Sequence, residues 1–136
     1  MIQKDLLLQD LSSRLPYGVK IDNMGEPSML VSINNKYRII VEIAEVDKNP
    51  SFDLTGLDVL EIEDAKPYLF PLSKMTKKQK EEFDALYWEA REKAPDYLFD
   101  FMYSSIKSNW LYKNHFDING LIPLGLAKDA TGLNIY

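Results

Sequence analysis

The side chains best suited to acid–base chemistry lie close together in the last quarter of the chain. His115, which is the only histidine, and Asp117 follow Tyr112 in the segment Trp110–Asp117. A histidine oriented by a carboxylate can act as a general base, with a tyrosine such as Tyr17 or Tyr112 beside it. A histidine that caps a helix end or hydrogen-bonds a loop carbonyl is the alternative. The sequence favours that structural role, because the nearby serines lack the pattern of an activated nucleophile.

Other catalytic chemistries lack the residues that they need. The chain contains no cysteine, which excludes disulfides, thiolate catalysis and cysteine-ligated zinc. A calcium loop starting at Asp117 would need a glutamate at its twelfth position, where Lys128 stands. The scattered glycines form no phosphate-binding loop. We therefore expect no catalytic residue, no metal ligand and no cofactor, and the sequence favours a protein without enzymatic activity over an enzyme, which stays open as an alternative.

Length and composition indicate one ordinary globular domain. The 136 residues are 46% apolar and 27% charged, which is typical of globular proteins. No stretch reaches the ~18 apolar residues of a membrane span, and the first ten residues lack the basic start of a signal peptide. We expect a cytoplasmic protein without a membrane partner.

The negative charge is concentrated in one stretch. The net charge is −5, and Glu42–Asp64 contains eight acidic residues against Lys48 alone. Such a stretch repels phosphate, so we expect no nucleic-acid partner. A protein that imitates the phosphate backbone, as a phage decoy for a nucleic-acid-binding enzyme would, is one alternative function. A solvated loop and strand face explains the same residues.

Periodicity predicts an α+β fold that begins with a helix. Leucines at helical spacing predict a helix over 3–14. Short strands follow at 19–22, around 29–33, at 37–43 and at 59–63, with Asn34-Asn35 as a hairpin turn. Met29, Val31 and Ile33 mark one face of the second strand. These strands predict a small antiparallel sheet, for which an SH3-like barrel is left open.

The second half of the chain is predicted to be helical. Two prolines in Pro67–Pro71 predict a rigid connector between a β-rich part at about 15–66 and a helical part at about 73–114. Thr76 and Gln79 match a capping box for a helix that ends near residue 93. In the next helix, Tyr97, Leu98 and Phe101 make the first turns apolar on nearly all sides, which predicts burial on several sides. An irregular tail follows, and the whole forms one domain, 1–136, with the helices packed on the sheet.

Aromatic residues give the candidate binding positions. Ten of the sixteen lie between Phe83 and Phe116, and aromatic residues dominate the energetics of cores and interfaces. Trp88 lies about 140° from Phe83 around its helix, outside the apolar stripe. It could pack within the chain or contact a partner. The candidate binding residues are Trp88, Trp110, Tyr112, His115 and Asp117.

Three groups of short motifs resemble a known family. They are Asp10-Leu11 with Arg14–Gly18, then Lys66–Leu69 with Pro71–Ser73 and Met75-Thr76, and lastly Asn114–Asp117 with Gly120–Ile122 and Gly125–Ala127. In this order they resemble a family of small proteins from gut Bacteroidetes and from phages or mobile elements of those bacteria. The resemblance implies a bacterial or phage intracellular setting and no particular activity.

These observations favour one function over two alternatives. We expect an accessory or regulatory protein that binds another protein or forms a homo-oligomer. A small enzyme using His115 and Asp117 and the acidic decoy are the alternatives. We also expect the turn at Arg14–Gly18 to lie near the segment His115–Gly120, because both are motif-like and carried on loops.

Overall fold

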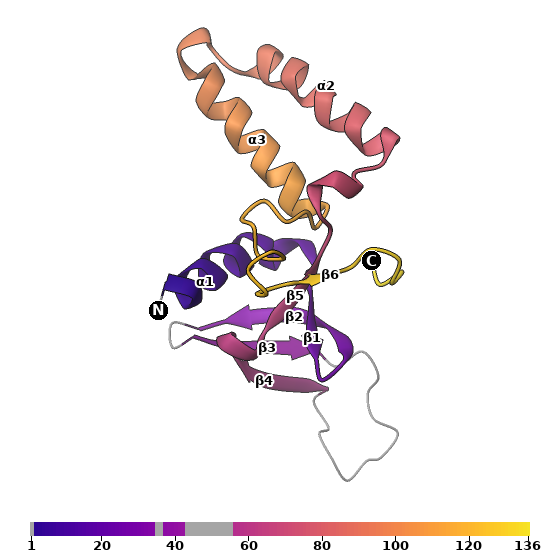
Figure 1. Ribbon diagram of the computed structural model, residues 1–136. Coiled ribbons are helices and arrows are strands. Elements are labelled where there is room, and N and C mark those ends of the chain that lie inside the picture. The colour runs from indigo at the N-terminus through magenta and orange to yellow at the C-terminus, as the bar shows by residue number, and fades with distance from the viewer. Residues whose placement is uncertain (1, 35–36, 43–55) are drawn as a thin grey trace.

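The chain folds into an α+β structure, as the sequence predicts. The computed structural model describes residues 2–34, 37–42 and 56–136. An N-terminal helix precedes the sheet, and two helices and a tail follow it (Figure 1). None of the helices in these ranges is both long and apolar enough to cross a bilayer. The helices are α1 (Ile2–Arg14), α2 (Lys77–Lys93) and α3 (Phe99–Lys113), and the strands are β1 (Lys20–Asn23), β2 (Glu26–Ile33), β3 (Arg38–Glu42), β4 (Leu57–Glu61), β5 (Lys66–Leu69) and β6 (Lys128–Asp129).

The described strands form one sheet with the order β4-β3-β2-β1-β5-β6. Strands β1 to β4 pair antiparallel in sequence order, and β5 pairs antiparallel with β1. The short strand β6 comes from the tail and runs parallel to β5. The sheet is therefore mixed, whereas the sequence predicted an antiparallel one. The narrower SH3-like assignment stays a prediction.

Helix α1 covers one face of this sheet. Leu7 and Leu11 are buried and pack in one cluster with Ile21 of β1 and Ile39 of β3. The remaining helix leucines are partly buried at the edges of the same cluster. The leucines thus form the apolar stripe of an amphipathic helix, as the sequence predicted, and this stripe faces the sheet.

The hairpin of β2 and β3 is confirmed, but β2 presents the opposite face to the core. Leu30 is buried opposite Val41, whereas Met29 and Val31 are exposed. Because Met29, Leu30 and Val31 are consecutive and all apolar, alternation could not distinguish the two faces, and a shift of one residue exchanges them. The predicted turn residue Asn35 lies outside the described residues.

The segment predicted as a rigid connector is in fact strand β5. Pro67 is buried and pairs with Ile21, and Lys66 pairs with Asp22. The ladder between β1 and β5 is only two residue pairs long, so the missing proline N–H costs little there. Strand β4 also begins and ends two residues before its predicted position.

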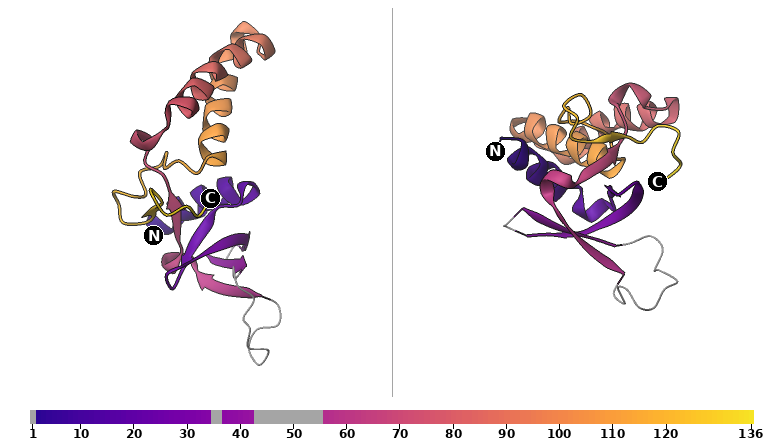
Figure 2. Two further views of the ribbon diagram at one scale, coloured as in Figure 1. Left: turned by 90° about the vertical axis from the view of Figure 1, so that its right-hand side faces the viewer. Right: turned by 60° about the horizontal axis from the view of Figure 1, so that its bottom comes forward.

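Helices α2 and α3 form a hairpin that projects away from the sheet (Figures 1 and 2). Their facing sides are joined by rings: Tyr87 contacts Phe99 and Tyr103, and Phe83 contacts Trp110. The prediction that both helices pack on the sheet is therefore wrong. The aromatic residues mainly hold the two helices to each other, and the far end of the hairpin extends into solvent.

The capping box at the start of α2 is confirmed in both directions. The Gln79 backbone N–H donates to the Thr76 hydroxyl over 3.1 Å, and the Thr76 N–H donates to the Gln79 side chain over 2.9 Å. Each bond satisfies a donor that a helix start would otherwise leave without a partner.

Replacing Thr76 tests how much this cap contributes. We expect Thr76→Ala to lower the free energy of unfolding by about 1 kcal/mol, because the hydroxyl acceptor is lost. Urea denaturation followed by circular dichroism measures it. Thr76→Ser keeps the hydroxyl and should stay within a few tenths of a kcal/mol of wild type. Equal losses in both variants would contradict a role for the hydroxyl.

Candidate functional site

The turn after α1 and the segment after α3 meet, as the sequence predicted. The Arg14 Nη2 group donates to the Phe116 carbonyl oxygen over 2.7 Å, and the Asn119 side-chain amide donates to Asp10 over 2.7 Å. We call the group formed by Asp10, Arg14, Tyr112, Phe116 and Asn119 the helix–tail junction. It brings together chain segments that are more than 100 residues apart.

A buried ion pair lies at the centre of the helix–tail junction. Arg14 and Asp10 are both 0% exposed, and Arg14 Nε and Nη2 donate to the two Asp10 oxygens over 2.7 and 3.1 Å. The guanidinium carbon lies 4.9 Å from the centre of the Tyr112 ring, a cation–π distance. Two carboxylate bonds and one carbonyl bond offset much of the cost of burying the charges.

Sequence reasoning did not place Arg14 and Asp10 in the core, although a signal was present. Positions 7, 10, 11 and 14 share one side of a helix, so Asp10 and Arg14 lie on the face that Leu7 and Leu11 bury. An acid and a base four residues apart on a buried face predict an ion pair rather than solvated charges.

Asp117 shapes the tail. Its two carboxylate oxygens accept hydrogen bonds from the backbone N–H groups of Leu121 and Ile122, over 2.8 and 2.9 Å. Its own backbone N–H donates to the Phe70 carbonyl oxygen, beside a parallel bridge between Phe70 and Phe116. Asp117 is buried, so this side chain holds a turn against the end of β5.

His115 packs on the last residue of the chain. Its ring stacks on Tyr136 with the ring centres 3.7 Å apart. The Tyr136 hydroxyl donates to the Tyr68 carbonyl oxygen and accepts from the Lys20 backbone N–H, which fixes that ring against β1 and β5. Burial, followed by the positive charges of Arg14 and Lys20, lowers the pKa of His115 to about 4. The ring is therefore neutral at neutral pH.

This arrangement does not form a base and its orienting acid. The Asp117 oxygens are occupied by backbone donors, and the His115 ring is held against Tyr136. The His115 Nδ1 atom is buried and has no hydrogen-bond partner among the described residues. Tyr112, the tyrosine invoked for the enzyme alternative, packs on Arg14. The geometry therefore gives each of these residues a packing or turn-forming role.

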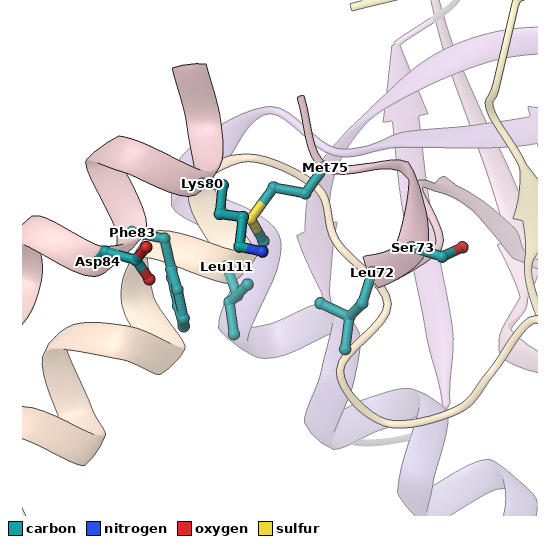
Figure 3. Close-up of a pocket in the computed structure, with 7 residues that line it drawn as sticks. All are labelled: Leu72, Ser73, Met75, Lys80, Phe83, Asp84 and Leu111. Carbon is teal, nitrogen blue, oxygen red and sulfur yellow. The ribbon is translucent and has the colours of Figure 1, made fainter. Parts of the chain in front are cut away.

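A hollow lies at the base of the hairpin. It has a volume of about 500 Å³ and opens between α2, the end of α3 and the turn before α2 (Figure 3). We call it the base cavity. Its lining includes neither His115 nor Asp117. Its apolar walls come from Leu72, Met75, Phe83 and Leu111, and its rim carries Lys80 and Asp84.

The two tryptophans have different environments. Trp110 stacks on Phe116 at 5.9 Å and also contacts Phe83, so it joins the hairpin to the helix–tail junction. Trp88 is 67% exposed and touches the edge of Tyr87. Only Trp88 of these two presents a large free surface.

Two exposed aromatic residues were missed as candidates by sequence reasoning. Tyr97 is 85% and Phe101 78% exposed at the far end of the hairpin, although the sequence predicted a helix buried on several sides there. We call Tyr97, Leu98 and Phe101 the tip cluster. Composition alone gave no signal of this exposure. A helix turn rich in aromatic residues is predicted to be buried unless the helix is known to project from the body of the protein.

The acidic stretch is only partly described, since residues 43–55 lie outside the structure's described ranges. Of its remaining carboxylates, Glu61 pairs with Arg38, Glu63 pairs with Lys4, and Asp58 accepts a hydrogen bond from Asn23. These carboxylates are engaged by neighbouring side chains within the fold, which does not favour a free row of charges.

Comparison of the chain with known protein families, curated protein sequences and solved structures found no match. Across the described residues, no group of three or more histidine, aspartate or glutamate side chains is placed to hold a metal ion. Arguments about function therefore depend on the surfaces described above.

Removing one partner of the buried ion pair should be costly. We expect Arg14→Ala and Asp10→Ala each to lower the free energy of unfolding by about 3–5 kcal/mol, because each leaves a buried charge without its partner. Urea denaturation measures both. Arg38→Ala breaks an exposed pair with Glu61 and should cost less than about 1 kcal/mol. Similar losses for Arg14→Ala and Arg38→Ala would contradict the central position of the buried pair.

His115 should make stability depend on pH. Its pKa is lowered to about 4 in the folded chain from an ordinary 6.5, so the unfolded chain binds the proton first. The contribution of His115 to the free energy of unfolding is fully present above pH 6.5 and is lost as the pH falls toward 4. The loss is about 1–2 kcal/mol once solvent screening is allowed for.

Melting temperatures measured across that range test this dependence. The matched variant is His115→Asn, because the backbone φ of +64° at this position suits asparagine. His115→Asn should be less stable at neutral pH, but its melting temperature should change less between pH 6.5 and 4. Parallel pH profiles for the two proteins would rule out His115 as the source.

Proposed function

We propose that this chain is an accessory or regulatory protein that binds another protein through the far end of its α2–α3 hairpin. The observation that carries the proposal is the tip cluster, where Tyr97 and Phe101 expose most of their surface on an element that projects from the body (Figure 2). Single exposed apolar residues are ordinary on protein surfaces. Three large ones within five positions are typical of an interaction surface.

The chemistry of the tip cluster fits protein binding. Tyr97 and Phe101 are four residues apart in a continuous helical segment, so they lie on neighbouring turns of one side. Tyrosine is enriched among the residues that dominate interface energetics. Burying such a ring contributes about 2 kcal/mol, which corresponds to about 30-fold in affinity.

The base of the hairpin supports presentation of the tip cluster in a fixed direction. Trp110 contacts both Phe83 within the hairpin and Phe116 in the tail. The Phe116 carbonyl oxygen in turn accepts a hydrogen bond from Arg14 of α1. A hairpin fixed at one end and apolar at the other loses less conformational entropy on binding than a mobile segment would.

The family resemblance extends this proposal to a setting. It implies a bacterial or phage protein, and we place the function in the cytoplasm on that basis. No observation at His115 or Asp117 favours the enzyme alternative, and the described acidic residues do not favour the decoy. We carry neither further.

Capture experiments in the cells that encode this chain would test the tip cluster. We expect the full chain to retain a specific protein, and Tyr97→Ser and Phe101→Ser each to weaken binding by about 30-fold when that protein and the chain are purified and titrated by calorimetry. Val59→Thr alters an apolar residue on β4 that is also exposed but lies on the sheet, so it should bind like wild type. Unchanged affinity in both tip variants would exclude this surface.

A further inference from the structure

We propose that two copies of this chain associate through α2, with Trp88 of each copy inserted into the base cavity of the other. The proposal rests on the proposed protein-binding function in assigning the hairpin to protein contact, and it names a second copy as the occupant. It concerns a different face from the tip cluster, so each can fail without the other.

The inserting side chain continues the row of α2 side chains that borders the cavity. Asp84 stands on the rim of the base cavity and Phe83 lines its wall. Trp88 follows Asp84 by four residues in α2, so it projects from the same side one turn away, about 6 Å along the helix. Trp88 is 67% exposed, and a cavity of about 500 Å³ is within the range that accepts drug-sized groups.

Two-fold symmetry makes this arrangement self-complementary. In a two-fold dimer, a contact from residue i to residue j is repeated from j to i. A two-fold axis that passes beside α2, midway between Asp84 and Trp88, makes the two α2 helices antiparallel. Each Trp88 then lies opposite the cavity rim of the other copy. Both indole rings then become buried among Leu72, Met75 and Leu111, side chains that offer apolar surface.

The distribution of charge along the hairpin favours the same antiparallel orientation. Residues 74–84 at the base of the hairpin carry four lysines against three acidic residues, a net charge of +1, with Lys80 beside the cavity. Residues 89–100 at the far end carry four acidic residues against Arg91 and Lys93, a net charge of −2. Antiparallel helices bring the basic base of one copy to the acidic far end of the other, at both ends of the interface. A parallel arrangement would place like charges together.

Sedimentation equilibrium of the full chain tests the association. We expect wild type to reach twice the chain mass as its concentration rises, and Trp88→Ala to raise the dissociation constant by about 30-fold. Val59→Ala is the control, because it removes exposed apolar surface from β4, on the sheet and outside α2, and should leave the dissociation constant unchanged. A wild-type chain that stays monomeric at the highest soluble concentration overturns the proposal, as does a Trp88→Ala variant that associates like wild type.

Charge reversal tests the orientation with substitutions at exposed positions. The double variants Lys77→Glu/Lys80→Glu and Asp96→Lys/Asp100→Lys should each self-associate at least tenfold more weakly than wild type, because both ends of the interface then have the same sign. Mixed together, the two variants should form a heterodimer with nearly wild-type affinity. Weak association in the mixture would exclude the antiparallel arrangement.

These results separate the two proposals. A Trp88→Ala variant that is monomeric but still binds a partner through the tip cluster would support both. Partner binding by a wild-type chain that never dimerises would leave the tip-cluster function standing and remove the dimer.

Discussion

The structure depends first on the burial of the Arg14 charge. A guanidinium that is 0% exposed needs acceptors that offset the cost of its burial, and the acceptors of its Nε and Nη2 groups come from two directions. Asp10 supplies a carboxylate from the same helix, and Phe116 supplies a carbonyl from the tail. The first bond can form within an isolated helix. The second requires the tail to return to α1, and so the need to satisfy one charge determines where the last third of the chain goes.

The rest of the tail follows from that return. With Phe116 fixed against Arg14 and bridged to Phe70, Asp117 turns the chain, and β6 then lies parallel to β5. The same position of Phe116 stacks Trp110 and thereby orients α3 and its partner helix. The hairpin projects because the aromatic residues on its facing sides contact one another, and its contact with the body is concentrated at its base.

The parts of the fold that sequence predicted correctly are those set by local patterns. Leucine spacing predicted α1, and the Thr76–Gln79 pair predicted the start of α2. Where tertiary context decides, local patterns failed. Consecutive apolar residues around Leu30 concealed which face of β2 is buried, Pro67 concealed strand β5, and the apolar turn at Phe101 read as buried although it is exposed. The stacking of His115 on Tyr136 joins residues without any periodic relation, so no pattern could indicate it. Trp88, which the sequence placed outside the apolar stripe of its helix, is exposed, whereas the exposure of the tip cluster was not predicted.

The bond between Arg14 and Phe116 spans 102 positions, and that separation bears on how the protein is made. A ribosome adds about 5–20 residues per second, so α1 emerges about 5–20 s before the carbonyl that completes its buried arginine. During that interval the guanidinium has only Asp10 as a charged neighbour in its own helix, and the apolar side of α1 lacks its final cover. The native structure is therefore completed late in synthesis. Chaperones would therefore find more exposed apolar surface to bind on the nascent chain than on the folded protein.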